Sequence, residues 1–445
     1  MKRLNINDVI DSSNINKFHW SIIWLCALLL IFDGYDLFIY GVVLPVLMDE
    51  WGLSPVQAGA LGSYALFGMM FGALIFGPVA DRIGRKSGVV ICFVIFSVAT
   101  FLNGFASSVT EFGIYRFIAG LGCGGLMPNA VALMNEYAPR RSRGTLVALM
   151  FSGYSLGGLV SAGMGIYMLP RFGWQAMFFS AAVPLVLLPL LLWKLPESVG
   201  FLLRQGKEER AREMLQKANP DEDLQGVELY QEEAKVSAVP VLDLFKEGRL
   251  IGTLMIWLAF FCCLLMVYAL GSWLPKLMAN AGYSLGSSLS FLLALNFGGI
   301  FGAIIGGWLG DRWGLPRVMV GFFVLSAVSI GLLGFKSPMI ILYGLIIVAG
   351  ATTIGTQILL YANAAQYYPL AMRSSGLGWA SGIGRFGAIA GPFLGGTLMS
   401  MALPLKMNFY AFAIPGVISA GAIGILILTL RYQAALKRSV VAISS

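Results

Sequence analysis

Two carboxylates, Asp33 and Asp36, lie three residues apart in the apolar stretch LLLIFDGYDLFIYG. On a helix, side chains at this spacing share one face. A charged side chain at the centre of a bilayer is costly, so an ionisable residue there is expected to have a function. Mutual repulsion and burial oppose the charge on both groups. We therefore predict that at least one of the pair binds and releases a proton, the alternative being a plain ion pair with an arginine.

Arg116 is the expected partner of these acids. It lies in a second apolar stretch, about 111–137, that runs through the membrane in the opposite direction from the first. Asp36 and Arg116 therefore fall at matching depths, and an arginine in hydrocarbon is expected to be paired. We assign Asp33, Asp36 and Arg116 to proton coupling. The sequence leaves open whether the pair with Arg116 is permanent or breaks during turnover.

Arg385 lies in the middle of the stretch SGIGRFGAIAGP, and neither this stretch nor the next one carries an acid. A guanidinium group binds a carboxylate through two parallel hydrogen bonds, so Arg385 is predicted to bind an organic anion. The alternative is a permanent salt bridge to the aspartates. Apolar walls with a few polar groups would complete such a pocket, although aromatic residues also serve as packing or interface anchors. The further candidates are Gln357, Tyr361, Asn296, Tyr268 and Trp273.

Membrane-spanning helices must position these residues. The 445-residue chain is 58% hydrophobic and 12% charged, with a mean hydropathy of +0.80. A soluble protein carries about 25% charged residues, so this composition indicates a polytopic membrane protein. The polar first 20 residues and the long first apolar run do not resemble a cleavable signal peptide. Twelve apolar stretches are predicted as spans, at about 21–45, 57–79, 87–106, 111–137, 143–166, 174–194, 250–275, 288–310, 316–335, 338–365, 374–400 and 407–431.

The distribution of positive charge predicts the orientation of these spans. If the N-terminus is cytoplasmic, only Arg171, Lys276, Lys336 and Lys406 face outside, and 24 of the 30 lysines and arginines lie on the cytoplasmic side. The positive-inside rule then places both termini in the cytoplasm. This asymmetry explains the net charge of +8, and no nucleic-acid partner is predicted. The predicted domains are a cytoplasmic segment 1–20, a six-helix bundle 21–195, a linker 196–249 with a short helix, a second bundle 250–432 and a cytoplasmic tail 433–445.

The two halves of the chain match each other at an offset of 230 positions. GPVADRIGRK at 77–86 aligns with GWLGDRWGLP at 307–316, Gly120 with Gly350, and Arg143 with Arg373. Repeated halves of a membrane protein predict a binding site between them, near the bilayer midplane. The alternative is an old duplication without a role in transport.

These motifs resemble the major facilitator superfamily. G-x3-D-R-x-G-R-K stands intact at 77–86, and RFIAGLG opens the fourth predicted span at 116–122. Within that superfamily, D-G-Y-D at 33–36 is similar to the aromatic acid:H⁺ symporter family, whereas PES at 196–198 also occurs in sugar porters. The second copy departs from the pattern, because Leu315-Pro316-Arg317 stands in place of the Arg-Lys pair.

The resemblance implies an all-α fold of twelve transmembrane helices in two pseudo-symmetric six-helix bundles. It also implies a secondary transporter that imports a small aromatic carboxylate, of the benzoate or hydroxybenzoate type, by proton symport through alternating access. Charged residues on the cytoplasmic loops are then expected to tie the halves together in one state. The predicted gating residues are Asp81, Arg82, Arg85, Glu136, Arg143, Asp311 and Arg373.

Other classes of protein are poorly supported by the residues. His19 is the only histidine, and the five cysteines lie in apolar runs and are interpreted as packing residues. No metal site, cofactor or catalytic triad is therefore expected, and the chain is predicted not to be an enzyme. The remaining alternative is a transporter of the same fold for a nicotinate-like acid, a sugar or an exported drug. We expect a monomer in the lipid bilayer of the inner, cytoplasmic membrane.

Overall fold

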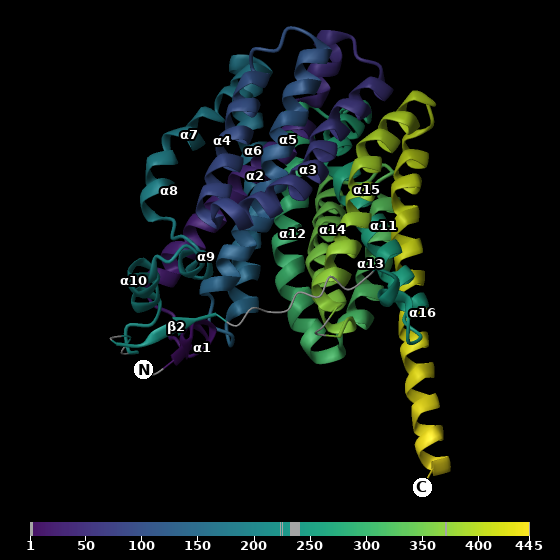
Figure 1. Cartoon of the computed structure of the whole chain (residues 1–445). Helices are drawn as coiled ribbons and strands as arrows, with labels where there is room; N and C mark the ends of the chain where they lie inside the picture. The colour runs from purple at the N-terminus through teal and green to yellow at the C-terminus, as the bar shows by residue number, and fades with distance from the viewer. Residues whose placement is uncertain (1–2, 223, 225, 232–240, 370–371, 445) are drawn as a thin grey trace. The chain divides into compact units, whose positions relative to one another are not determined.

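The computed structural model describes residues 3–222, 224, 226–231, 241–369 and 372–444, so part of the predicted linker, 232–240, lies outside the described residues. Within these ranges the chain is almost wholly helical, with two short strands (Figure 1). The elements of the first half are β1 (Arg3–Asn5), α1 (Ile6–Asp11), α2 (Lys17–Trp51), α3 (Pro55–Ile83), α4 (Arg85–Asn103), α5 (Val109–Tyr137), α6 (Arg143–Phe179), α7 (Ala182–Val186), α8 (Leu188–Lys194), α9 (Val199–Arg204), α10 (Glu208–Ala218) and β2 (Glu228–Tyr230).

The second half has the longest helix of the chain. This helix, α16, extends along the yellow segment of Figure 1 well beyond the ends of its neighbours α11 and α13, through the predicted spanning stretch and the predicted tail. The elements are the short 3-10 helix η1 (Val241–Phe245), α11 (Leu250–Asn280), α12 (Leu285–Trp313), α13 (Leu315–Leu332), α14 (Met339–Tyr367), α15 (Arg373–Ser400) and α16 (Leu405–Ser444).

The helices group into two compact units. The first contains Met1–Ile39 and Tyr64–Lys235, and the second contains Tyr40–Ser63 and Val236–Ser445. The second unit therefore includes one end of α2 and one end of α3 together with α11 to α16. The predicted domain boundaries follow the sequence repeat instead, and they stay a prediction.

Ten of the described helices are long and apolar enough to cross a membrane. The predicted spans at 174–194 and 374–400 are the two without such a helix. In the first, α6 kinks at Gly173, whose φ of 76° favours glycine, and the chain is then divided into α7 and α8, where Pro184 and Pro189 lack the backbone donors that a continuous helix needs. In the second, α15 is one unbroken helix of 28 residues, but its glycines, serines and two arginines lower its hydropathy.

The repeat in the sequence is also a repeat in helix packing. In the first unit, a Cβ atom placed on Gly120 of α5 would lie 2.0 Å from the carbonyl oxygen of Ala65 on α3. In the second unit, a Cβ on Gly350 of α14 would lie 1.9 Å from the carbonyl oxygen of Leu295 on α12. The second contact repeats the first at an offset of 230 positions, because Gly350 corresponds to Gly120 and Leu295 corresponds to Ala65. Glycine at these points lets the helix backbones touch, as small residues do in membrane proteins.

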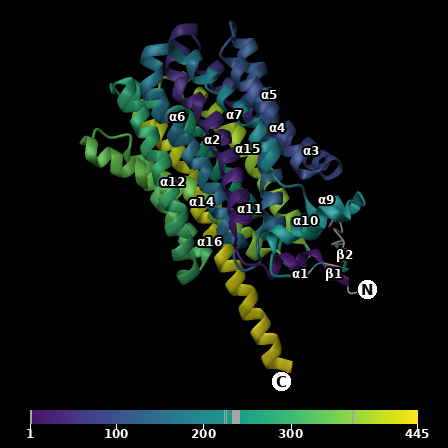
Figure 2. The same cartoon turned by 90° about the vertical axis from the view of Figure 1, so that its left-hand side faces the viewer.

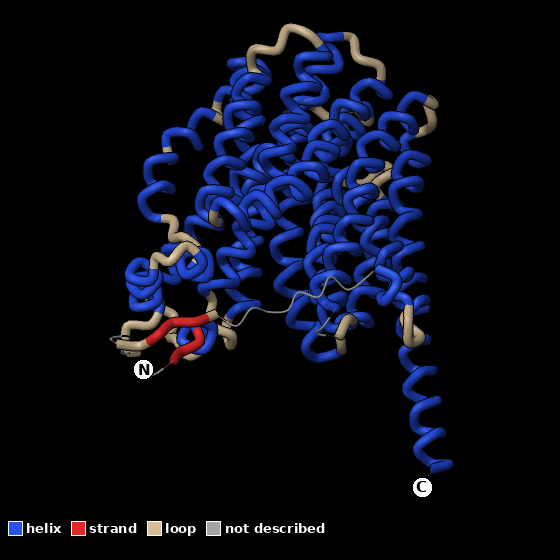
Figure 3. Tube along the Cα trace, in the orientation of Figure 1, coloured by secondary structure: helices blue, strands red, loops and turns tan. Residues whose placement is uncertain are grey.

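The N-terminal segment folds onto the linker rather than standing apart as a polar tail. Strands β1 and β2 pair in parallel, and both views place them beside α1 and α10 (Figures 2 and 3). Arg3 forms an ion pair of 2.8 Å with Glu228, which holds the pKa of that carboxyl below its ordinary value. The side-chain amide of Asn219 donates to the backbone oxygen of Val9 at 3.0 Å. The predicted short helix of the linker is present as α10.

Candidate functional site

An ion pair between α2 and α5 is buried in the first unit. The Nη1 atom of Arg116 lies 3.2 Å from Oδ2 of Asp36 and donates to the backbone oxygen of the same residue at 3.1 Å. The hydroxyl of Thr100 on α4 donates to Oδ1 of Asp36 at 2.5 Å. Asp36 and Arg116 are each only 1% exposed. The structure thus brings together the two residues whose matching depths suggested a pair, and their role in coupling stays a prediction.

Asp33 lies one helical turn before Asp36 on α2 and is fully buried. The thiol of Cys123 on α5 lies 3.9 Å from Oδ2 of Asp36 and is also close to Asp33. One sulfur atom therefore stands beside both carboxylates. Since Arg116 and Thr100 hold Asp36, the two acids have different surroundings although they share a helix face.

Gly34, between the two acids, has a structural reason for its identity. A Cβ atom at this position would lie 2.1 Å from the carbonyl oxygen of Tyr154 on α6. Any other side chain would push α6 away from the segment that carries the acids. The glycine of the D-G-Y-D motif thus fixes how closely α6 covers Asp33 and Asp36.

Sequence reasoning missed two members of this cluster. Cys123 was interpreted as a packing residue, although it follows Arg116 by seven residues, two helical turns, and so lies on the same face of α5. That spacing was a usable signal. No comparable sequence signal pointed to Thr100, because threonine is common in apolar spans and its partner, Asp36, lies on another helix.

In the second unit, three predicted substrate residues lie at half-buried positions. Arg385 occupies the middle of α15, and Gln357 and Tyr361 lie one turn apart on α14. The hydroxyl of Tyr361 is 3.1 Å from that of Ser381 on α15, and its ring meets Phe260 edge to face at 5.0 Å. The Tyr361–Ser381 contact joins α14 to α15 one turn from Arg385.

The other three substrate candidates are buried. Asn296 is fully buried on α12, where its amide nitrogen donates to Leu292 at 3.0 Å, and its Oδ1 has no hydrogen-bond partner among the described residues. Trp273 is also fully buried, and its indole nitrogen donates to the backbone oxygen of Pro392 on α15 at 2.8 Å. Tyr268 is 8% exposed on α11. Trp273 thus uses its only side-chain hydrogen-bond donor on the backbone of α15, whereas the Oδ1 atom of Asn296 can accept a further hydrogen bond.

In the first unit, three of the predicted gating residues form a network around Arg85, where α3 ends and α4 begins. This arginine lies 2.6 Å from Asp81 and 3.7 Å from Glu136. A polar cavity of about 200 Å³ lies beside all three. Glu197 of the PES sequence accepts a hydrogen bond from the backbone nitrogen of Lys86 at 3.1 Å. Glu197 was not among the predicted gating residues, although its motif had been recognised.

The remaining gating candidates are placed differently. Arg143, at the start of α6, lies 2.8 Å from Asp11 of the N-terminal segment, a partner that the sequence did not suggest. Arg82 and Asp311 are exposed at the ends of α3 and α12, and Arg373 begins α15 half-buried. Arg82, Asp311 and Arg373 form no ion pair within the part of the chain that the structure describes, and their gating role stays a prediction.

Within the second unit, the segment Tyr40–Ser63 packs against α11 and α15. A Cβ atom on Gly41 would lie 2.0 Å from the carbonyl oxygen of Gly271. The hydroxyl of Ser63 donates to the backbone oxygen of Ile389 at 2.7 Å. Lys276 forms an ion pair of 3.0 Å with the exposed Asp49. The connected ends of α2 and α3 thus contact two helices of the other sequence half.

Known proteins resemble this chain over most of its length. A sequence model described as Major Facilitator Superfamily matches residues 26–314 and 288–441. The chain is 48% identical over 425 residues to the benzoate transport protein of Acinetobacter baylyi, covering 94% of this chain and 91% of that protein. It is 34% identical over 428 residues to the 4-hydroxybenzoate transporter PcaK of Pseudomonas aeruginosa, covering 95% and 96%.

A solved structure of the xylose transporter XylE from E. coli, in a partially occluded inward-open conformation, resembles the fold with a TM-score of 0.72. It is 19% identical and covers 91% of this chain and 97% of that one. The predicted fold class, an all-α membrane protein of the major facilitator type, is thereby confirmed. The relatives are transporters, and the expectation that the chain is not an enzyme agrees with them. This multi-pass membrane transporter belongs to the major facilitator superfamily.

Proposed function

We propose that the chain imports a small aromatic carboxylate, of the benzoate or hydroxybenzoate type, together with protons. The carrying observation is the buried cluster of two carboxylates and one arginine in the first unit, since acids deep in a membrane protein mark proton pathways. The benzoate and 4-hydroxybenzoate transporters among the relatives support the substrate class.

The two acids take different parts in this proposal. Asp36 is held by the guanidinium of Arg116 and the hydroxyl of Thr100, so it keeps its negative charge balanced within the protein. Asp33 lies one helical turn before Asp36 and is fully buried, and it is the residue that binds and releases the transported proton. A neutral Asp33 lowers the cost of moving the buried cluster through a closed state, because burial penalises a charge.

Arg385 binds the carboxylate of the substrate. It is half-buried in the middle of a helix without an acid of its own, and a guanidinium group matches the two oxygens of a carboxylate. Tyr361 and Gln357 on the same side of the unit offer hydrogen bonds to ring substituents. The amide oxygen of Asn296 accepts a hydrogen bond from a hydroxyl group or from water. The substrate roles of Tyr268 and Trp273 are weaker, and for Trp273 we favour packing.

Transport follows the alternating exposure of these groups. From outside, a proton binds Asp33 and the substrate binds Arg385, so that each charged group is compensated before the path closes. The contacts of Tyr40–Ser63 with α11 and α15 act as one gate, and the network of Asp81, Arg85 and Glu136 belongs to the other. Both cargoes then leave on the cytoplasmic side, and the proton gradient drives accumulation.

We place the protein as a monomer in the inner, cytoplasmic membrane, with both termini in the cytoplasm. The asymmetry of positive charge supports this orientation. No cofactor is needed for the proposed cycle, because the energy comes from the proton gradient. The predicted domain organisation, two six-helix bundles joined by the linker, belongs to the same proposal.

An uptake screen in proteoliposomes tests the proposal. Purified protein is supplied with labelled benzoate, 4-hydroxybenzoate, nicotinate, xylose or an organic amine, with the vesicle interior more alkaline than the medium. We expect accumulation of the aromatic carboxylates, abolished by an uncoupler, above the passive uptake of protein-free vesicles. Accumulation of xylose or the amine instead would reject the substrate class, and uptake unchanged by the uncoupler would reject proton coupling.

A further inference from the structure

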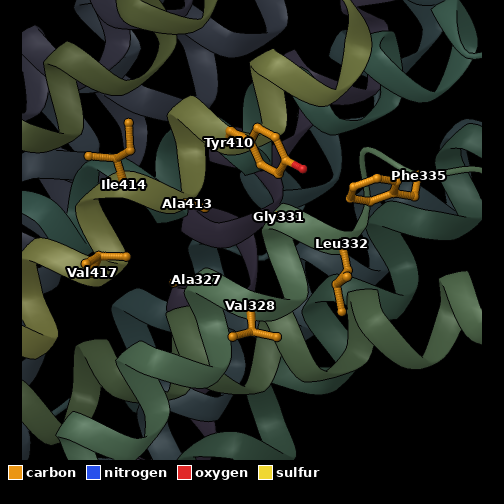
Figure 4. A pocket seen from close by; sticks show the side chains of 9 residues that line it. All are labelled: Ala327, Val328, Gly331, Leu332, Phe335, Tyr410, Ala413, Ile414 and Val417. Carbon is orange, nitrogen blue, oxygen red and sulfur yellow. The ribbon is translucent and has the colours of Figure 1, made fainter.

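An apolar groove lies between α13 and α16 in the second unit. It has a volume of about 400 Å³ and almost no polar lining. Figure 4 shows the side chains of both helices around it, with Tyr410 and Phe335 near one end and Val417 and Val328 towards the other. Gly331 contributes no side chain, which deepens the groove at its middle. The lining residues are Ala327, Val328, Gly331, Leu332, Phe335, Tyr410, Ala413, Ile414 and Val417.

The groove lies on a surface that hydrocarbon must cover. Val417 is 62% exposed, Ile414 55% and Val328 52%, and both helices are among those long and apolar enough to cross a membrane. Large exposed aliphatic side chains on a spanning helix face lipid rather than water. The occupant of this concave apolar surface is therefore an acyl chain.

One end of the groove carries positive charge. Lys336 follows Phe335 directly. Lys406 precedes Tyr410 by four residues, so that Lys406 and Tyr410 share a face of α16. The rings of Phe335 and Tyr410 lie 6.2 Å apart. A Cβ atom on Gly334 would be 2.6 Å from the Cα atom of Lys406. The loop after α13 and the start of α16 are thus in direct contact, and both exposed lysines stand at the same end of the groove.

No acid in the neighbouring sequence neutralises these lysines. The segments 327–338 and 400–417, which supply the groove and its charged end, contain no aspartate or glutamate. Lys336 and Lys406 are also two of only four lysines and arginines that the proposed orientation leaves outside. A positive end on an apolar groove at a helix terminus is complementary to a phosphate attached to an acyl chain.

We propose that this groove binds an anionic phospholipid, with one acyl chain between α13 and α16 and the phosphate at Lys336 and Lys406. The hydroxyl of Tyr410, at the charged end of the groove, is a further donor for a phosphate oxygen. In the proposed orientation the site belongs to the outer leaflet. It is separate from the acids of the first unit and from Arg385.

Native mass spectrometry of the full-length protein tests the head-group preference. The protein in detergent is titrated with phosphatidylglycerol or with phosphatidylcholine of the same acyl chains. A lysine near an anionic lipid strengthens binding by about fivefold, so two give a preference of roughly 30-fold. We expect Lys336→Gln and Lys406→Gln to remove about fivefold each, and the double variant to bind both lipids alike. Arg171→Gln, on the first unit, is the matched control and keeps the preference.

A second variant distinguishes the contribution of the acyl chain to binding from that of the head group. Gly331→Leu fills the middle of the groove, where a Cβ atom would meet only ordinary contacts with the Tyr410 ring at 3.6 Å, and it should weaken both lipids by a similar factor. Equal binding of the two lipids by wild-type protein, or an undiminished preference in the double lysine variant, would overturn the proposal. Glycerol phosphate that competes as well as the lipid would also overturn it, because the site would then need no acyl chain.

Discussion

The two units share a backbone arrangement but carry different side chains at equivalent places. Gly157 of α6 approaches the carbonyl oxygen of Ile31 on α2 as closely as Gly387 of α15 approaches that of Phe261 on α11, with a Cβ atom at 2.1 and 2.0 Å. Each contact recurs 230 positions later. The glycines therefore set the same close helix crossings in both units, whatever chemistry the neighbouring positions perform.

The chemistry differs at the positions between those crossings. The equivalents of Asp33, Asp36 and Arg116 in the second unit are Cys263, Met266 and Ile346. Conversely, Arg385 and Tyr361 of the second unit correspond to Ser155 and Val131 of the first. A single scaffold thus holds a buried ion pair in one copy and apolar packing in the other. The comparison teaches that one copy carries the buried acids and the other carries Arg385, and in the proposed function these sets handle the proton and the substrate respectively.

Asp33→Asn should give the largest effect, since it removes the proposed proton site and leaves the scaffold intact. We expect proton-driven accumulation of benzoate in proteoliposomes to fall at least 100-fold, with exchange of labelled for unlabelled benzoate retained. The matched control is Cys263→Ser, the equivalent place in the second unit, which should keep both activities. Accumulation by Asp33→Asn at the wild-type level would break the proposed division between the units.

Arg116→Ala should be the most destabilising substitution in the first unit. It leaves the carboxylate of Asp36 buried without its arginine, and breaking a buried ion pair costs roughly 3–5 kcal/mol. Thermal unfolding of the purified protein measures this loss. The double variant Asp36→Leu with Arg116→Leu, which copies the apolar state of the second unit, should recover most of the stability. A double variant as unstable as Arg116→Ala would show that the pair is not the source of the effect.

Much of the fold could be predicted from sequence, because hydrophobic length and glycine spacing are local properties. Most of the spans and the offset of 230 follow from them, and the pairing of Asp36 with Arg116 follows from the matching depths of the two residues in their spans. The roles of Thr100 and Glu197 could not, since each contacts a partner on another element that no periodicity reveals. The fold of the N-terminal segment onto α10 escaped for the same reason: Asn219 and Val9 are distant in the sequence. Whether Arg385 contacts substrate likewise depends on the folded structure and on its conformational changes, and a local sequence pattern does not reveal it.

Gly120→Ala and Gly350→Ala sharpen the comparison of the scaffolds. Each added methyl group would meet a carbonyl oxygen at about the same distance, so the helices must separate slightly in either case. Overpacking of this kind costs roughly 1–3 kcal/mol. We expect the two variants to lower the midpoint of thermal unfolding by similar amounts. A large loss in only one unit would show that the equivalent contacts are not energetically equivalent.

Cys123→Val should have the smallest effect, because the thiol is a weak hydrogen-bond donor. It removes the thiol that stands beside both acids and replaces it with a somewhat larger, wholly apolar side chain. We expect uptake to fall by roughly threefold, with its dependence on pH displaced, whereas Cys123→Ser should keep the wild-type pH profile. The matched substitution in the second unit, Thr353→Val, should leave the pH profile unchanged. Identical profiles for Cys123→Val and wild type would limit Cys123 to packing.

Proton movement driven by substrate tests the central claim most directly. Proteoliposomes containing a pH indicator are given an inward gradient of 4-hydroxybenzoate and no proton gradient, with protein-free vesicles measuring passive entry of the acid. Wild-type protein should acidify the interior faster than passive entry does, and Asp33→Asn should not, although it still exchanges substrate. Equal acidification by Asp33→Asn would contradict the assignment of the proton to Asp33, and none beyond passive entry with wild-type protein would contradict symport itself.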